Sequence, residues 1–169
     1  MTLQFSEIAP SILSVKQSEY LECFVGLCDF LYPLADSHPR SRSRILLHSE
    51  VSDLPQEMLI AFNFNSIVEV ASHQFPESFT ILDGSARYFF FNPDGSHLAD
   101  VILSPFGTNS SFYCYIPQSL HHRFCPLSEY TLAHELVFSH FDSSLTTIYL
   151  TQPFDSISAL SNKSLSLVP

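Results

Sequence analysis

One histidine and one glutamate stand four residues apart in the stretch VASHQFPESF, residues 70–79. Imidazole nitrogens and carboxylate oxygens both coordinate divalent metals, so His73 and Glu77 are candidate ligands. Ala71 stands two residues before His73, where a further ligand could sit, and its methyl group coordinates nothing. The stretch therefore leaves three alternatives open: a working metal site, a weakened one, or a site put to another use.

The spacing of these residues places them on one face of a predicted strand. Side chains alternate with a period of two along a strand, so Glu69, Ala71 and His73 share one face of residues 66–73. If the following turn points His73 inward, Glu77 reaches the same spot from the next strand. We therefore expect Glu69 and Ala71 to line the interior beside this pair.

Two adjacent histidines begin a later predicted strand. His122 shares a face with Phe124, whereas His121 shares the opposite face with Arg123. Only one of the two histidines can therefore face the interior, and we expect His121 to face outward.

The elements that must position these residues are mostly strands. Short runs rich in branched and aromatic residues follow one another at roughly ten-residue spacing with no helix between them, which is typical of an antiparallel sandwich or barrel. Asp83-Gly84 and Asn92-Pro93-Asp94-Gly95 offer the positive-φ glycine that hairpins use. The runs are 44–48, 57–64, 66–72, 78–83, 85–92, 97–103, 111–116, 121–125 and 130–138.

One helix is expected before the strands. Ser14 and Gln17 fit a capping box, and an apolar stripe with helical spacing follows them. Pro33 is expected to end the helix, because proline lacks an N–H group and clashes with the preceding turn. The predicted helix therefore covers about residues 15–32, and its stripe consists of Leu21, Phe24, Cys28 and Leu31.

The domain organisation that we expect is a single domain in three parts. Residues 1–36 form an N-terminal arm and helix, with the arm over 1–13. Residues 37–155 form the β-barrel, and residues 156–169 form a Ser-rich C-terminal tail.

Composition narrows the classes of partner and the compartment. The 169 residues are 46% hydrophobic and carry a formal charge of −10, which repels nucleic acid and anionic lipid. The N-terminus lacks a signal-peptide pattern, and no apolar run is long enough to cross a membrane. The cysteines form no C-x-x-C pair either, so we expect a cytoplasmic protein. We also expect a small-molecule ligand, no nucleic-acid or membrane partner, and a homodimeric state.

Three of the chain's seven lysines and arginines are clustered as Arg40, Arg42 and Arg44. They could form exposed ion pairs in an acidic protein. The alternative is an anion-binding site, because alternate residues of a strand share a face and a guanidinium matches the geometry of phosphate or carboxylate.

The ordered motifs of the chain resemble those of the cupin superfamily. The first cupin motif, apart from its first histidine, has the spacing H-x3-E-x6-G, which is matched by His73, Glu77 and Gly84. The second has the spacing P-x-G-x2-H, which is matched with Ser in place of Gly by Pro117, Ser119 and His122.

The pattern over about residues 37–142 is more closely similar to WbuC-type cupin-fold metalloproteins. The matching stretches are SHPRSRSRILLH (37–48), ESFTILDG (77–84), YIP…H (115–122), PLS (126–128) and HE (134–135). The resemblance implies an all-β fold, a double-stranded β-helix or jelly-roll barrel preceded by an N-terminal α-helix. It also implies a metal held by His, His, Glu and His, and an association with bacterial surface-polysaccharide gene clusters.

Carried over to this chain, the resemblance assigns His73, Glu77 and His122 as metal ligands and puts Ala71 at the first histidine position. Two histidines and one carboxylate remain, the ligand count of a catalytic zinc site or a facial-triad iron site. The ion could be Zn, Fe, Mn or Ni, and its affinity is expected to be lower than at a four-ligand site. Glu69 could substitute only if the site shifted inward.

Three functions follow from these residues. The leading one is a cupin-fold metal-binding protein acting on a sugar or other small molecule in bacterial surface-polysaccharide metabolism. The second is a metal-free sugar-nucleotide isomerase or epimerase, in which His73 or His122 takes a proton and Tyr113 or Tyr115, expected to line the barrel, returns one. The third is a non-catalytic small-ligand binding or dimerisation module with a degenerate metal site.

Overall fold

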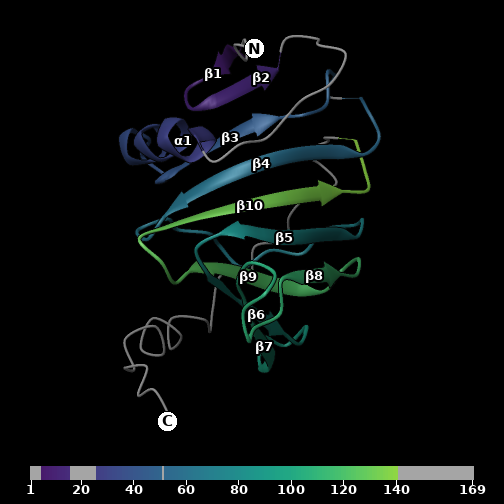
Figure 1. The fold of residues 1–169 in the computed structure, drawn as a ribbon. Helices are drawn as coiled ribbons and strands as arrows, with labels where there is room; N and C mark the ends of the chain where they lie inside the picture. The colour runs from purple at the N-terminus through teal and green to yellow at the C-terminus, as the bar shows by residue number, and fades with distance from the viewer. Residues whose placement is uncertain (1–4, 16–25, 51, 141–169) are drawn as a thin grey trace.

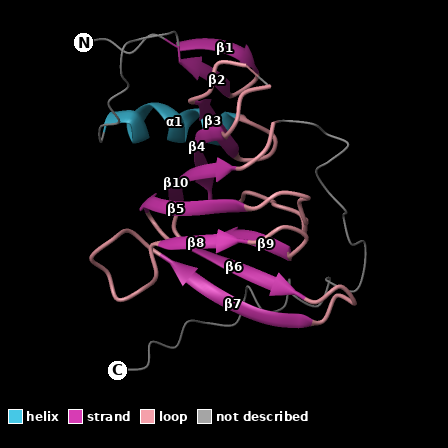
Figure 2. Ribbon diagram, turned by 90° about the vertical axis from the view of Figure 1, so that its right-hand side faces the viewer, coloured by secondary structure: helices cyan, strands magenta, loops and turns pink. Residues whose placement is uncertain are grey.

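The computed structural model describes residues 5–15, 26–50 and 52–140. They form two antiparallel-rich sheets and one helix (Figures 1 and 2). The larger sheet has seven strands in the order β1-β2-β3-β4-β10-β5-β8, and the smaller has three in the order β7-β6-β9. The mostly β architecture expected from the sequence is confirmed, but the two sheets do not close into a barrel.

The bounds of the strands match most of the predicted runs to within one or two residues. The strands after the helix are β3 (Arg42–Leu46), β4 (Gln56–Asn63), β5 (Glu77–Asp83), β6 (Ala86–Phe91), β7 (His97–Leu103), β8 (Tyr113–Ile116), β9 (His121–Pro126) and β10 (Tyr130–Val137).

The main core lies between the two sheets. Phe62 and Phe79 of the large sheet meet Tyr88 and Phe124 of the small sheet, and all four are buried. The ring centroids of Phe62 and Phe124 are 4.4 Å apart, and those of Phe79 and Tyr88 are 5.2 Å apart. Burial of this aromatic surface is a large favourable contribution to the stability of the fold.

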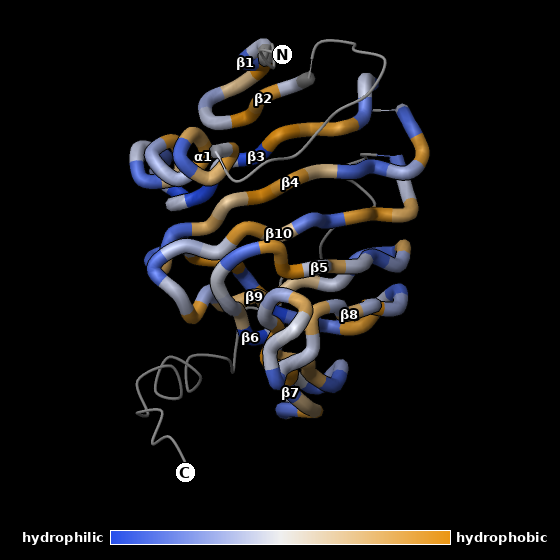
Figure 3. Tube along the Cα trace, viewed as in Figure 1, coloured by the Kyte–Doolittle hydropathy of each residue, from blue (hydrophilic) through white to orange (hydrophobic). Residues whose placement is uncertain are grey.

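A second core lies on the opposite face of the large sheet. There the helix α1 (Gly26–Ser37) packs Leu27 and Leu31 against Ile45 and Leu59. Figure 3 shows the hydrophobic residues along β3 and β4, which the helix covers on one side. Since side chains of a strand alternate, the residues of β3 between those facing the helix point into the space between the sheets.

The predicted N-terminal arm is wrong for its described part. Residues Phe5–Ala9 and Ile12–Val15 form the strands β1 and β2, an antiparallel pair that extends the large sheet through β3. Ser14 pairs with Ser6 in this ladder, so it does not cap a helix. Neither FSEIA nor ILSV alternates polar and apolar residues, so the strands could not be read from a period of two.

The predicted helix is also wrong at its C-terminal end. The described helix α1 covers Gly26–Ser37 and so continues past Pro33, whereas the predicted residues 16–25 lie outside the described residues. Pro33 removes one hydrogen bond, but it faces solvent, while Leu31 and Ala35 are fully buried on the helix face that packs on the sheet. Tertiary packing therefore outweighs the local cost of the proline. The rest of the predicted stripe and the Ser-rich tail lie outside the described residues.

The predicted strand 66–72 is reduced to one bridge. Ala71 pairs with His122 through backbone hydrogen bonds of 2.9 and 2.8 Å, while Ile67 is 67% exposed. The segment meets the small sheet only where it passes β9, so the preceding residues have no neighbouring strand.

The helix α1 has 12 residues, fewer than the roughly 20 that a membrane-spanning helix needs. The described residues therefore contain no helix that is long and apolar enough to cross a membrane.

Gly84 lies where the chain passes from β5 in the large sheet to β6 in the small one, rather than in a hairpin of one sheet. Its φ is +74°, and a Cβ atom there would clash with the carbonyl oxygen of Tyr130. The predicted hairpin at Gly95 is confirmed between β6 and β7, where φ is +85°. Only glycine satisfies both the conformation and the space at Gly84.

We predict that Gly84→Ala lowers the free energy of unfolding by about 2–4 kcal/mol, because a backbone shift is added to the conformational cost. Gly107→Ala is the matched control: its φ is +94°, but nothing lies within 4 Å of the added atom. The control should cost only about 1 kcal/mol in urea unfolding. An equal loss of unfolding free energy in the two variants would contradict this account of the connection between β5 and β6.

Candidate metal centre

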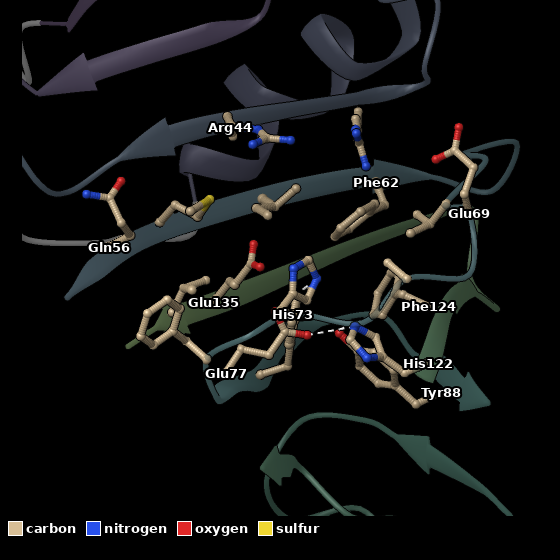
Figure 4. Close-up of a pocket in the computed structure, with 18 of the residues that line it drawn as sticks. Arg44, Gln56, Phe62, Glu69, His73, Glu77, Tyr88, His122, Phe124 and Glu135 are labelled. Carbon is tan, nitrogen blue, oxygen red and sulfur yellow. Dashed lines mark ion pairs between the residues drawn. The ribbon is translucent and has the colours of Figure 1, made fainter. Parts of the chain in front are cut away.

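A cavity of about 260 Å³ opens between the sheets. Its wall is built by inward-facing side chains of β3, β4, β10 and β5, and by residues of β6, β9 and the segment before β5 (Figure 4). Because each strand sends alternate side chains inward, the cavity collects residues that are far apart in the sequence.

Three candidate ligands meet in this cavity. One ligand atom each from His73, Glu77 and His122 lie within 4.8 Å of one another. Glu77 Oε1 is 2.8 Å from His122 Nε2, and Glu77 Oε2 is 3.6 Å from His73 Nε2. Metal bonds of about 2.0–2.2 Å place neighbouring ligand atoms roughly 3–3.5 Å apart, so this donor set fits a divalent ion after small adjustments.

The positions of the three side chains follow from their strands. Glu77 is the first residue of β5 and faces inward, with only 3% of its side chain exposed. His122 is the second residue of β9, with 8% of its side chain exposed, and lies beside Ala71 in the bridge. His73 follows two residues after that bridge, so it lies on the same side as Ala71.

A backbone carbonyl fixes the orientation of His122. Its Nδ1 lies 2.9 Å from the oxygen of Leu120, and a carbonyl can only accept, so Nδ1 carries a proton. Nε2 then faces Glu77, so it is the nitrogen that a metal ion would bind in place of the proton.

Burial alone would lower the pKa of His122, but the hydrogen bond and the charge of Glu77 outweigh it, and the pKa is raised. The second proton, on Nε2, sits where a metal ion would lie.

The pKa of His73 moves the other way. Burial lowers it, the charge of Glu77 opposes this, and the positive charge of His122 lowers it further. His73 is therefore neutral at pH 7, the form that coordinates a metal.

Ala71 lines the cavity beside these groups and offers no donor atom. Glu69 also lines it, but its carboxylate is half exposed and held by Arg40 at 2.9 Å. Glu69 is thus bound to the rim and does not reach the triad in this structure. The position of the expected first histidine is left as open space.

The arginine cluster lines the same cavity. Of the two alternatives for the cluster, exposed ion pairs or an anion-binding site, Arg40 takes the first, because it pairs with Glu69. Arg42 and Arg44 point inward from β3, opposite to Ser43 and Ile45, which are buried toward the helix.

The two tyrosines expected to line the barrel lie elsewhere. Tyr113 and Tyr115 are 47% and 52% exposed on β8, while Cys114 and Ile116 turn to the core. The strand alternation allows only one of these pairs to face inward, and the more apolar pair does so. His121 is partly buried, and its Nδ1 has no hydrogen-bond partner among the described residues.

Glu135 is the cavity residue that the sequence reasoning missed. It lies on β10, between Met58 of β4 and Phe79 of β5, and faces the cavity. Burial and then the charge of Glu77 raise its pKa to about 7, although Arg44 and Arg42 oppose this. The available signal was that Glu135 shares a strand face with Ala133 and Val137, so an acid stands among apolar residues on the inward side of β10.

We predict that Glu135→Gln stabilises the metal-free protein increasingly with pH. The carboxyl keeps its proton in the folded state up to about pH 7 but loses it near pH 4.5 when unfolded, so the stability of the natural protein falls across this window. Glutamine does not titrate, and the gain should reach about 1–2 kcal/mol above pH 7.

Urea unfolding at pH 5 and pH 8, with a chelator present, measures this gain. Glu129→Gln removes the same charge from an exposed position before β10 and is the control. A gain for Glu135→Gln that is equal at both pH values would contradict the assignment.

Comparisons with known proteins agree on the fold. Residues 26–103 match the family described as Domain of unknown function (DUF6016). A search of curated proteins finds no significant match. Protein SO0799 from Shewanella oneidensis is similar with a TM-score of 0.58 and 10% identity, covering 72% of this chain and 83% of that one.

Two further structures are similar. CapF, a capsular polysaccharide assembling protein from Staphylococcus aureus, has a TM-score of 0.54 and 16% identity, over 66% of this chain and 32% of CapF. Oxalate oxidase in complex with glycolate has a TM-score of 0.50 and 13% identity, over 62% of this chain and 54% of that one. This chain therefore spans only about a third of CapF. These likenesses show a cupin fold, here with an open barrel; the finer resemblance to WbuC-type proteins stays a prediction.

Proposed function

We propose that this chain is a cupin-fold metal-binding protein in which His73, Glu77 and His122 hold one divalent ion. The observation that carries the proposal is the meeting of two imidazoles and a carboxylate within 4.8 Å in a cavity. Burying Glu77 is costly unless a positive charge or a metal ion lies beside it; His122 can supply that charge, and a bound ion would supply more.

Three protein ligands leave a coordination position open. The methyl group of Ala71 leaves room in the cavity beside the triad, so a ligand oxygen can approach the ion from there. A divalent ion at such a site acts as a Lewis acid, polarising a carbonyl or hydroxyl oxygen of the bound molecule. The chain's own residues bind the ion, orient it and keep water away from one side of it.

The biological setting that we propose is bacterial surface-polysaccharide metabolism, with a sugar or a related small molecule as the ligand. Two observations support it: the motif resemblance to WbuC-type proteins and the fold likeness to CapF, whose name refers to capsular polysaccharide assembly. A cytoplasmic homodimer is part of the same proposal.

The metal-free isomerase alternative is less well supported. Its proton-returning residue was to be Tyr113 or Tyr115, and both lie outside the cavity. The non-catalytic binding module remains the outcome if the triad holds no metal.

We predict that protein made without a His-tag and freed of metal by a chelator binds about one equivalent of Zn²⁺ in calorimetric titration. His122→Ala removes a ligand and should weaken this binding at least about tenfold. His134→Ala is the control, because His134 pairs with Glu57 at 2.7 Å outside the cavity. Its zinc affinity should equal that of the natural protein.

Adding a ligand at the triad gives a second test of the same site. Ala71→His adds an imidazole beside the triad and should raise zinc affinity at least about tenfold. If neither the natural protein nor Ala71→His binds zinc, the metal-binding proposal fails. If His122→Ala binds as tightly as the natural protein, the ion lies elsewhere.

A further inference from the structure

Arg42 and Arg44 are the charged side chains that β3 directs into the cavity. They stand two residues apart on one strand, next to Phe62 and Ile60 of β4, and so share its inner face. Figure 4 shows Arg44 extending from β3 toward the space over His73 and Glu135. Since Arg42 shares that face of β3, both side chains enter the cavity from this strand.

No side-chain hydrogen bond or ion pair joins the guanidinium group of Arg42 or Arg44 to any residue that the structure describes. Arg40 and Arg87, in contrast, each lie against a carboxylate, at 2.9 Å from Glu69 and 3.1 Å from Asp100. In a chain with 17 acidic residues and a formal charge of −10, acids to pair with are abundant. The acids of the cavity, Glu69, Glu77 and Glu135, form no described ion pair with Arg42 or Arg44, so both guanidinium groups are available to a ligand.

The positive charges of this cluster are held together at a cost. Burial, and then the charges of Arg44 and Arg40, lower the pKa of Arg42 to about 10. Partly desolvated like charges destabilise the folded state unless an anion lies between them. Glu135 attracts both groups, but its raised pKa leaves it partly protonated at pH 7.

We propose that Arg42 and Arg44 bind an oxyanionic group, a carboxylate or a phosphate, of the small molecule that enters this cavity. A guanidinium presents two parallel N–H donors to such a group, and two guanidiniums on one strand face can converge on the same oxyanion. Arg40 is paired with Glu69 at the mouth of the cavity, so it lies at the outer end of this anion site.

The size of the cavity limits the molecule. A cavity of about 260 Å³ has room for a group of about the size of a monosaccharide derivative. The substrate class is therefore a small acid or sugar carrying a carboxylate or phosphate at one end. That its other end meets a metal at the triad rests on the function proposed above.

The test measures anion binding without any metal. Metal-free natural protein at low ionic strength is titrated with inorganic phosphate and, separately, with malonate, and binding is followed by calorimetry and by thermal stability. The double variant Arg42→Gln/Arg44→Gln should bind at least about tenfold more weakly. Arg87→Gln removes one positive charge outside the cavity and should bind as the natural protein does.

Preferred binding of phosphate would identify a phosphate-bearing molecule, and preferred binding of malonate a carboxylate-bearing one. The proposal is overturned if neither anion binds the natural protein, or if the double variant binds as well as Arg87→Gln does. Should the double variant fail to fold, as judged by circular dichroism, each single variant must weaken binding at least about threefold, with Arg44→Lys weakening it less than Arg44→Gln.

Zinc titration of the same proteins separates the two proposals. The double variant should bind zinc within about threefold of the natural protein, since it keeps all three ligands. If the natural protein binds the anion but not zinc, the metal-centre proposal is contradicted and the anion-site proposal is supported. If it binds zinc but not the anion, the anion-site proposal is contradicted and the metal-centre proposal is supported.

Discussion

A buried carboxylate between two imidazoles is the interaction on which the rest of the site depends. Glu77 lies at the start of a central strand, almost fully removed from water, with His122 at 2.8 Å and His73 at 3.6 Å. Such a group is stable inside a protein only with positive or metal partners. The bridge between Ala71 and His122 and the carbonyl of Leu120 hold the imidazoles in place around it.

The open cavity follows from how the two sheets meet. Aromatic rings fill the core between them, but β3 contributes Arg42 and Arg44 to the inner face, where apolar residues would have extended that core. The result is a cavity with a candidate metal-binding group and with arginine side chains along its wall. Positive charge concentrated there in an acidic protein favours the entry of an anion.

Most of the strands and the three candidate metal ligands could be predicted from local sequence patterns. Runs of branched and aromatic residues separated by turn residues predict most of the strands after the helix, and the motif spacing predicts that His73, Glu77 and His122 meet. Pro33 and Tyr113 could not be placed from the sequence, since the first depends on packing of α1 against the sheet and the second on which face of β8 turns inward. Glu135 was missed because the energy of one inward acid depends on neighbours from three other strands.

The central claim is that one divalent ion is bound by these three residues. Crystals of the protein grown with Zn²⁺, measured at the zinc absorption edge, test it directly. The account predicts one anomalous peak at about 2.0–2.2 Å from His73 Nε2, His122 Nε2 and a carboxylate oxygen of Glu77. A cavity without a peak under saturating zinc, or a peak bound by other residues, would contradict it.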